Sequence, residues 1–260
     1  MSTSSNLIVT SRAENGVLLV TLDRPAQLNA LSAELLQQMA AVLVEAQGDP
    51  EVRCVVVTGN NRAFSAGADI KEMQRQGFEA ISNHARQSAW RTIEHFSKPM
   101  IAAVRGVCLG GGLEFAMLAD IIIAAENAVF SQPEITIGII PGDGATQRLT
   151  RVIGKSLAMK MVLTGQPIDG REALRSGLVA EALPDDQVVD RAIALAKVIA
   201  ERAPIAARLA KEAVLAAYET TLAAGLDVER RAIRLAFTTE DQKEGMAAFV
   251  EKRAPTFQGR

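Results

Sequence analysis

Aromatic residues are scarce in this chain of 260 residues, in which Phe, Trp and Tyr together make up 4%. Hydrophobic residues of all kinds nevertheless reach 48%, which is enough for one core of ordinary density built from aliphatic side chains. The sequence also lacks internal repeats, low-complexity runs and an evident flexible linker. These features together predict one compact globular unit.

Cysteine and histidine are rarer still, with two residues of each. Cys54 and Cys108 lie among small apolar residues, which favours buried free thiols over a disulfide. A nucleophilic role for Cys108 is disfavoured because neither histidine lies near it in the sequence. His84 and His95 lie about three turns apart in one helical pattern, which favours a solvated or packed role over metal binding. No spacing of ligand residues predicts a metal site.

An excess of one charge is absent as well. Lys and Arg number 28 against 30 Asp and Glu, for a net charge of -2, which predicts no general attraction to nucleic acid or to an anionic membrane surface. No apolar run approaches the roughly 20 residues that span a bilayer, and residues 1–16 lack the pattern of a secretory signal. We therefore expect a cytoplasmic protein whose partners include neither nucleic acid nor membrane.

Short β-rich runs alternate with helical patterns, which predicts an α/β architecture. Helical patterns begin at Ser32, Phe78, Gly111 and Gly144, and runs typical of strands occur at residues 7–12, 17–24, 54–59, 100–106, 120–125 and 178–183. Residues 194–237 have a helical pattern, with breaks expected at Pro204 and Gly225. We therefore divide the chain into a core, residues 1–184, and a C-terminal helical region, residues 185–260. The apolar stripes of that region cover either the core or a neighbouring subunit.

Two turns rich in small residues each precede a helical pattern. Gly110 to Gly112 leave backbone NH groups bare at a helix N-terminus, where they can hold an anionic oxygen. The alternative is that these glycines only permit close packing of strand, turn and helix. A dinucleotide-binding fingerprint is incomplete there, because Phe115 takes the place of the third glycine. The second turn, residues 66–68, offers further NH groups, and the spacing of Asp69 and Glu72 favours a helix-capping role for Asp69 over a catalytic one.

Two glutamates, Glu114 and Glu134, lie in the segment 110–142, which is otherwise nearly uncharged. A carboxylate in apolar surroundings is costly to keep ionised, so its pKa rises toward neutrality, where it can exchange protons. Pro133 restricts the preceding residue to an extended conformation and so fixes the direction of Glu134. The alternative for both is an exposed position, which the apolar neighbours of Glu114 disfavour. The pair therefore predicts acid–base chemistry.

Four separated motifs stand out in the chain, and they are RPAQLNAL (24–31), FSAGADIKEM (64–73), GGGLEFAMLADIIIAAENAVFSQPEITIGIIPG (110–142) and the ending KRAPTFQGR. In this order they resemble the crotonase superfamily, and within it the enoyl-CoA hydratases. The resemblance covers nearly the whole chain. It implies a crotonase-type spiral of ββα units in two stacked sheets, followed by C-terminal helices that take part in trimerisation. In this superfamily two trimers often form a hexamer.

The resemblance also implies an acyl-CoA thioester substrate, with no metal and no cofactor, since CoA enters only as part of the substrate. The thioester oxygen is then held by the backbone NH groups of Ala68 and Gly111. Glu114 takes a proton from the attacking water, and Glu134 orients that water and delivers a proton to C2 of a trans-2-enoyl chain. The substrate-binding positions implied are Ala66, Asp69, Ile70, Lys71 and Gly142.

Both glutamates bear on the choice of reaction within the superfamily. Members that only move a double bond generally manage with one acid–base residue, so the pair favours a hydratase over an enoyl-CoA isomerase. Another reaction of the superfamily, such as dehalogenation or thioester hydrolysis, and a non-catalytic acyl-CoA-binding scaffold remain as alternatives.

Asp143 is a departure from the superfamily, which usually has a small residue at this position. As the residue before a predicted helix, Asp143 is expected to cap that helix. The alternative is that it points inward and raises the pKa of a neighbouring glutamate by repulsion between like charges.

Overall fold

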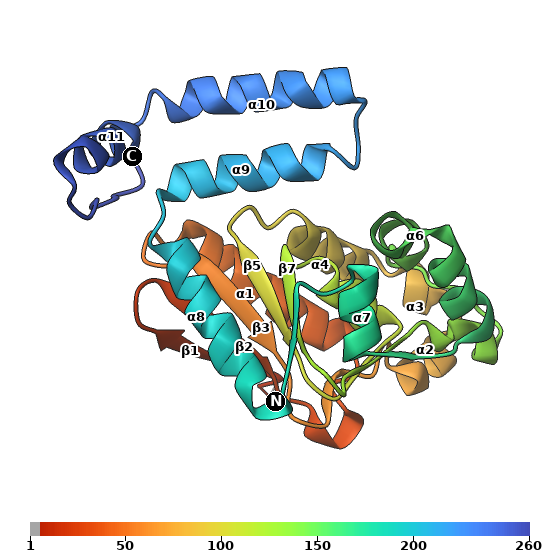
Figure 1. Cartoon of the computed structure of the whole chain (residues 1–260). Helices are drawn as coiled ribbons and strands as arrows, with labels where there is room; N and C mark the ends of the chain where they lie inside the picture. Colours follow the sequence, from red (N-terminus) through yellow and green to blue (C-terminus); the bar gives the residue numbers. More distant parts are fainter. Residues whose placement is uncertain (1–5) are drawn as a thin grey trace.

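The computed structural model describes residues 6–260, which form two β-sheets surrounded by helices (Figure 1). The larger sheet has six strands, in the order β1 (Ile8–Ala13), β2 (Val17–Leu22), β3 (Cys54–Thr58), β5 (Met100–Val104), β7 (Ile121–Ala125) and β10 (Glu181–Leu183). β1 pairs antiparallel with β2, and the later pairs in this sheet are parallel. β3 and β5 are buried over their whole length, as expected for strands in a parallel sheet covered on both faces.

From β3 to β8, successive strands along the chain belong alternately to the larger sheet and to the smaller one. The order of the smaller sheet is β4 (Ala63–Ser65), β6 (Val107–Leu109), β8 (Val129–Ser131) and β9 (Ile168–Asp169). Each of the pairs β3 and β4, β5 and β6, and β7 and β8 gives its first strand to the larger sheet and its second strand to the smaller one. Helical segments follow each pair. The predicted α/β spiral of ββα units is confirmed.

The strands of the smaller sheet were not found among the β-rich runs of the sequence. They are two or three residues long, and hydrophobic periodicity cannot be recognised over so few positions. The run at residues 178–183 likewise contains only three residues of strand, in β10. The second sheet was therefore predictable only from the resemblance.

The core helices begin close to their predicted starts. They are α1 (Ala33–Gly48), α2 (Ile70–Gln76), α3 (Glu79–Ser82), α4 (His84–Glu94), α5 (Gly111–Ala116), α6 (Ala145–Thr164), α7 (Gly170–Ser176) and α8 (Val188–Ala200), with the 3-10 turns η1 (Pro25–Gln27), η2 (Pro133–Ile137) and η3 (Asp185–Gln187). Ser32 caps α1, because its Oγ accepts the Leu35 NH at 3.2 Å. The helical pattern that begins at Phe78 is divided in two at Asn83, whose backbone NH donates to the Glu79 carbonyl at the end of α3 and whose side chain caps α4 by accepting the Arg86 NH.

α8 packs on the larger sheet. It contacts β2, β3, β5 and β7. Its buried residues are Val188, Ala192, Ala196 and Ala200. The boundary predicted at residue 185 therefore precedes a helix that packs with the core, and the helices that project from the core begin after it.

Three helices project from the core at the C-terminal end (Figure 1): α9 (Pro204–Ala216), α10 (Leu222–Ala236) and α11 (Glu240–Glu251). The break expected at Pro204 is confirmed, since α9 begins there. The break expected at Gly225 is wrong, because α10 continues through that glycine. Thr221 caps α10, and packing of α10 on α9 outweighs the cost of about 1 kcal/mol for glycine inside a helix.

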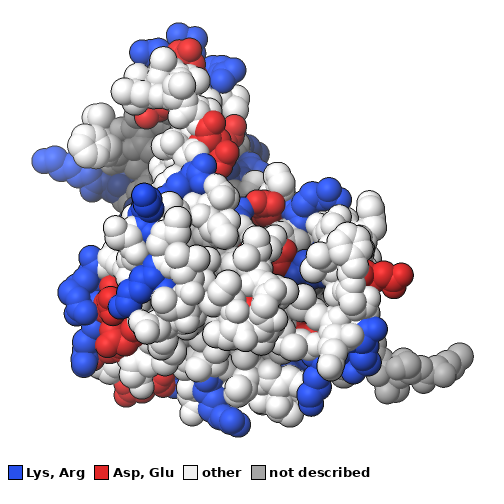
Figure 2. Space-filling model, turned by 90° about the vertical axis from the view of Figure 1, so that its right-hand side faces the viewer, with Lys and Arg blue, Asp and Glu red and all other residues white. Residues whose placement is uncertain are grey.

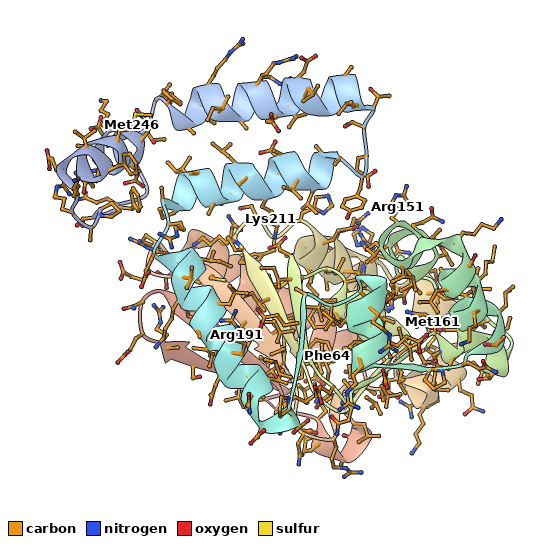
Figure 3. All side chains as sticks on the ribbon, in the orientation of Figure 1. Phe64, Arg151, Met161, Arg191, Lys211 and Met246 are labelled. Carbon is orange, nitrogen blue, oxygen red and sulfur yellow. The ribbon has the colours of Figure 1, made fainter. Side chains whose placement is uncertain are left out.

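Lys211 joins the projecting helices to the core (Figure 3). Its ammonium group lies 3.0 Å from the Asp120 carboxylate, and it also donates to the Lys98 carbonyl at 3.0 Å. The side chains of Lys211 and Asp120 are mostly buried, so this pair fixes α9 against the end of the sheet more firmly than an exposed ion pair could.

Charged side chains are mixed in sign on the face drawn in Figure 2, where Lys and Arg lie in small groups around a largely uncharged centre. Among residues 6–260 no helix is both long enough and apolar enough to cross a membrane.

Candidate active site

The turn at Gly110 directs the polypeptide from β6 into the short helix α5. Gly110 has φ 50° and ψ −125°, a conformation that residues with a side chain rarely adopt. Its NH donates to the Ser131 carbonyl of β8 at 2.8 Å. Gly112 is packed so closely that an added Cβ would lie 2.5 Å from the Ser65 carbonyl oxygen. The glycines therefore serve close packing, as the simpler interpretation predicted, and also place Glu114 in the first turn of α5.

Glu114 is buried, with 2% of its surface exposed. Its Oε1 accepts the backbone NH groups of Asp143 at 2.8 Å and Ala145 at 2.9 Å. Burial raises the pKa of Glu114 to about 7, the charges of Asp143 and Glu134 act in the same direction, and the two NH donors oppose the shift. The carboxyl group can therefore gain and lose a proton near neutral pH.

Glu134 approaches the same turn from η2. Pro133 begins this turn of 3-10 helix, and a Cβ added to Gly110 would lie only 2.6 Å from Glu134 Oε1. The buried Gln132 amide, in the orientation that matches its neighbours, donates to both carboxylate oxygens of Glu134 at 3.0 and 3.1 Å. Burial raises the pKa of Glu134, and the negative charge of Asp143 adds to the effect.

The two carboxylates converge on adjacent residues of one turn. Glu134 touches Gly110, and a Cβ added to the next residue, Gly111, would lie 3.9 Å from Glu114 Oε2. The structure thus brings together the two glutamates that the sequence analysis selected, both with pKa values raised by burial. Two carboxyl groups in this position can take a proton from one atom and give a proton to another.

Two backbone NH groups point toward the same place. In the bridge between Leu31 and Ala68, the Leu31 NH donates to the Gly67 carbonyl at 2.7 Å and the Asp69 NH donates to the Leu31 carbonyl at 3.3 Å. This alternation directs the Ala68 NH away from the bridge. Within residues 6–260, neither the Ala68 NH nor the Gly111 NH donates to an acceptor of the chain.

A small group can lie between these two NH donors. A Cβ added to Gly111 would lie 3.5 Å from the Ala68 nitrogen, and one added to Gly67 would lie 3.5 Å from the Gly111 nitrogen. The two turns of small residues predicted from the sequence are therefore neighbours. Their NH groups form a pair that can hold an oxygen on which negative charge develops.

Asn29 supports the Ala68 turn and was not selected from the sequence. It is fully buried, with φ 57°. Its side-chain amide donates to the Ala63 and Phe64 carbonyls at 2.9 and 3.1 Å, and its Oδ1 accepts the Arg24 NH at 2.9 Å. The only available signal was its place in the RPAQLNAL motif, because its partners lie up to 35 residues away.

Replacing Asn29 with Ala is expected to lower the free energy of unfolding by about 3 kcal/mol, because two buried carbonyls and one NH lose their partner. Urea unfolding followed by circular dichroism measures the loss. Asn15 is the matched control, since it also has a left-handed backbone (φ 61°) but is exposed. Equal losses in the Asn29 and Asn15 variants would contradict the role of the buried amide.

Four of the five predicted substrate-binding positions lie in or next to the Ala68 turn, and the fifth, Gly142, precedes Asp143, whose NH contacts Glu114. The Asp69 carboxylate caps α2 by accepting the Glu72 NH at 3.1 Å and pairs with Arg24 at 3.1 Å, so its capping role is confirmed. Ala66 donates its NH to the Leu28 carbonyl at 2.9 Å. Ile70, Lys71 and Gly142 are exposed, and within residues 6–260 no carboxylate pairs with Lys71.

Asp143 does not cap α6, so the capping expectation is wrong. The N-cap position is Gly144, which has no side chain to offer. The Asp143 carboxylate instead forms a two-point ion pair with the Arg86 guanidinium of α4, in which Nη1 lies 3.1 Å from Oδ1. Its charge contributes to the raised pKa values of both Glu114 and Glu134, as the alternative interpretation stated.

The remaining candidates from the sequence lie outside this site. Cys54 and Cys108 are buried free thiols, as predicted, and burial raises the pKa of both, which makes them poor nucleophiles. His84 and His95 are exposed at the two ends of α4. No group of three or more His, Cys, Asp or Glu side chains within residues 6–260 is arranged to hold a metal ion.

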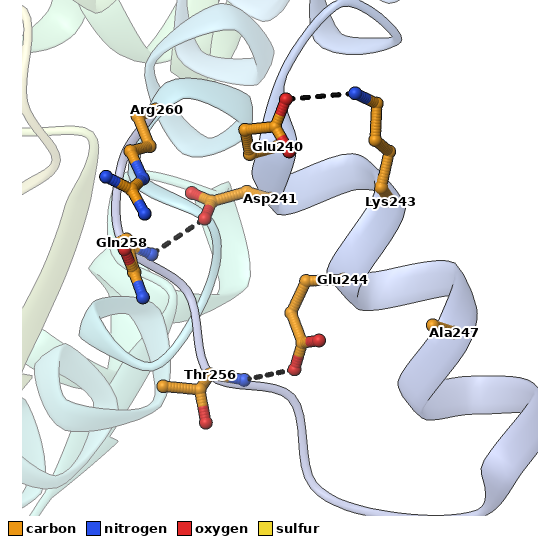
Figure 4. A pocket seen from close by; sticks show the side chains of 8 residues that line it. All are labelled: Glu240, Asp241, Lys243, Glu244, Ala247, Thr256, Gln258 and Arg260. Atoms are coloured by element: carbon orange, nitrogen blue, oxygen red, sulfur yellow. Dashed lines mark hydrogen bonds and ion pairs between the residues drawn. The ribbon is translucent and has the colours of Figure 1, made fainter.

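A hollow of about 570 Å³ lies between α11 and the C-terminal tail (Figure 4). Its acidic groups have partners within the chain. Asp241 accepts the Gln258 NH at 2.7 Å, Glu244 accepts the Thr256 NH at 2.8 Å, and Glu240 pairs with Lys243 at 2.9 Å. We therefore assign the chemistry to the glutamates at the Gly110 turn and not to this hollow.

Comparisons with known proteins agree with this geometry. The model of the enoyl-CoA hydratase/isomerase family matches residues 12–260. The 2,3-dehydroadipyl-CoA hydratase of Escherichia coli K12 is 47% identical over 256 residues, which is 98% of this chain and 100% of that protein. A probable enoyl-CoA hydratase of Rhizobium meliloti is 49% identical and covers 93% of this chain and 94% of its own. A crystal structure of enoyl-CoA hydratase from Bacillus anthracis has a TM-score of 0.92 at 38% identity and covers 98% of this chain and 100% of that chain. This chain belongs to the enoyl-CoA hydratase/isomerase family.

Proposed function

We propose that this chain is an enoyl-CoA hydratase, which adds water across the 2,3 double bond of a trans-2-enoyl-CoA thioester to give 3-hydroxyacyl-CoA. The observation that carries the proposal is the convergence of Glu114 and Glu134 beside Gly110 and Gly111, next to two NH groups that have no acceptor in the described part of the chain. The family match and the hydratase relatives support it.

The two NH groups supply the electrostatic part of the mechanism. When water attacks C3, negative charge develops on the thioester oxygen as an enolate. In our proposal the NH groups of Ala68 and Gly111 donate to that oxygen, and the rigid turns hold them in place before the reaction begins. Removal of one such donor typically costs about 3 kcal/mol of transition-state stabilisation.

The glutamates handle the protons. In our proposal ionised Glu114 takes a proton from the attacking water, while Glu134 orients that water and delivers a proton to C2. The Asp143 and Ala145 NH groups stabilise the ionised form of Glu114, and the Gln132 amide fixes the direction of Glu134. Since both carboxylates contact the same turn, water adds across one face of the double bond.

Recognition of the CoA portion is assigned to the residues around the Ala68 turn. We propose that Ala66, Ile70 and Lys71 contact the adenine and pantetheine portions, and that the Gly142 NH helps to hold the reacting water. The Asp69 side chain is occupied by Arg24 and the α2 N-terminus, so its proposed contribution is to hold the turn in shape.

The experiment that tests this proposal offers the purified protein two substrates. With crotonyl-CoA, we expect rapid loss of the absorbance of the conjugated enoyl thioester. With a 3-enoyl-CoA, an isomerase would generate that absorbance instead, and this outcome would move the assignment within the family. Binding of crotonyl-CoA without turnover would indicate an acyl-CoA-binding scaffold.

We propose that the reaction uses no metal and no cofactor, with CoA present only as part of the substrate, because the glutamates and NH donors supply both proton transfer and charge stabilisation. Dialysis against EDTA is therefore expected to leave kcat for crotonyl-CoA unchanged. A catalytic metal contributes several kcal/mol to a transition state, so a large loss restored by a divalent cation would contradict this prediction.

We further infer that the protein is a homotrimer, or a dimer of trimers, that forms through its C-terminal helices and works in the cytoplasm. Large apolar side chains are exposed on α9, α10 and α11, including Leu222 at 80% and Phe249 at 85%. Such exposure is unusual for a surface in contact with water. Light scattering coupled to size-exclusion chromatography measures the oligomeric mass, and a monomer at micromolar concentration would contradict the trimer.

A further inference from the structure

The loop that carries Asp143 lies between the two glutamates and two arginines. Its backbone contacts Glu114 through the Asp143 NH at 2.8 Å. The Asp143 side chain pairs with Arg86, and the Asp143 carbonyl accepts a hydrogen bond from Arg148 Nη1 at 3.2 Å. Gly144 lies against the Arg148 guanidinium. Asp143 thus connects the buried Glu114 carboxylate to one arginine on α4 and one on α6.

The Arg86–Asp143 ion pair has a fixed orientation. Both side chains are mostly buried, with 18% and 17% of their surface exposed. The Arg86 guanidinium carbon lies 5.9 Å from the centre of the Trp90 ring, within the range of a cation–π contact that favours this position of the guanidinium. A bidentate pair between an arginine and a carboxylate fixes orientation as well as charge.

The charged groups near Glu114 come from three elements and from the loop before α6. Asp143 precedes α6, Arg86 lies on α4, Glu134 lies on η2 and Arg148 lies on α6, where it pairs with Glu94 of α4. Because Arg86 pairs with Asp143 and Glu94 pairs with Arg148, these four side chains together carry no net charge, and Arg86 offsets part of the Asp143 charge that acts on the two glutamates. Loss of one member of the Arg86–Asp143 pair exposes Glu114 to an unbalanced charge.

We propose that Arg86 is a positioning residue that neutralises Asp143 and holds its loop against Glu114, and that this ion pair sets the pH range in which the glutamates work. The proposal rests on the hydratase function proposed above. The charge of Asp143 acts on both glutamates in the same direction, since it raises the pKa of Glu114 and that of Glu134. A change in the pair should therefore move both together.

The direction in which the pH profile is expected to shift follows from the roles of the two glutamates. Glu114 must be ionised to accept a proton and Glu134 must be protonated to deliver one, so the profile of kcat/KM against pH is bell-shaped and its two limbs belong to the pair of glutamates. Removing Arg86 leaves the Asp143 charge unbalanced, which raises both pKa values and moves the whole bell to higher pH. Removing the Asp143 charge moves it to lower pH.

The experiment measures kcat/KM for crotonyl-CoA between pH 5 and 10 in a set of variants. Arg86→Met keeps the alkyl chain on Trp90 and should shift the bell upward by about 1 pH unit, and Asp143→Asn should shift it downward by a similar amount. The double variant, which lacks both charges, should return close to the parent profile. Arg86→Lys, which keeps the charge, should also stay close to it. Arg191→Met is the matched control, because Arg191 lies on α8 (Figure 3) and pairs there with Glu181 of β10, which takes no part in the site.

A purely structural role for Arg86 gives a different result. The bell of Arg86→Met would then become lower without moving, and the second substitution would not restore it. Either outcome overturns the proposal. A carbon-13 NMR titration of labelled glutamate carboxyls in the parent and variants gives the ionisation of Glu114 directly. An unshifted Glu114 in Arg86→Met would overturn the inference even if the parent did not hydrate crotonyl-CoA, which would overturn only the hydratase function.

Discussion

Replacing Glu114 with Gln is expected to lower kcat for crotonyl-CoA by about 10³-fold, the usual contribution of a positioned general base. Gln has nearly the same shape, and its carbonyl oxygen can still accept the Asp143 and Ala145 NH groups that hold Glu114 Oε1. The fold should therefore be preserved while the proton acceptor is lost. Steady-state kinetics and a thermal unfolding curve of the same sample measure both quantities.

The companion variant Glu134→Gln should lose activity to a similar degree, because in our proposal the two carboxylates act on one water molecule. Glu126→Gln is the matched control, since Glu126 pairs with Arg171 on the surface and should retain full activity. If Glu114→Gln kept more than a tenth of the parent kcat, Glu114 would not be the base. If only one of the two glutamates mattered, the isomerase alternative would gain support.

Replacing Gly110 with Ala is expected to lower kcat by about 100-fold through displacement of Glu134, because a catalytic group misplaced by about 1 Å costs this much. The new Cβ would lie 2.6 Å from Glu134 Oε1, closer than any nonbonded contact allows. The carboxylate must move away from the Gly110 turn, and so from the Gly111 NH that holds the thioester oxygen in our proposal. The substrate-binding NH groups stay in place, so KM should change less than kcat.

Gly77→Ala separates this displacement from backbone strain. Gly77 has φ 58° and ψ −133°, close to the values of 50° and −125° at Gly110. A Cβ added there meets no atom within 4 Å. Both variants should lose about 1 to 3 kcal/mol of stability from the strained conformation, but only Gly110→Ala should lose activity. Equal losses of kcat in both would show that strain, and not the position of Glu134, explains the effect.

Local rules predicted those parts of the structure whose causes lie close together in the sequence. Ser32 caps α1, Asp69 caps α2, and α9 begins at Pro204. In each case the residue that fixes the boundary lies within a few positions of it. The same reasoning failed for Asp143, because its carboxylate finds a stronger partner in Arg86, 57 residues away.

The candidate site depends on contacts that local rules cannot describe. Glu114 and Glu134 were selected for their apolar surroundings, but their approach to adjacent glycines results from the spiral, which returns β8 to lie beside β6. Asn29 reaches across to β4 for the same reason. Propensities contain no information about such pairs, whereas a resemblance over nearly the whole chain does.

The most direct test of the central claim is conversion of crotonyl-CoA in water labelled with oxygen-18, followed by mass spectrometry of the product. The account predicts a 3-hydroxyacyl-CoA with the heavy oxygen at C3, formed by the parent and lost in both glutamine variants of Glu114 and Glu134. Conversion without incorporation of the label at C3, or equal incorporation by the parent and the two variants, would contradict it.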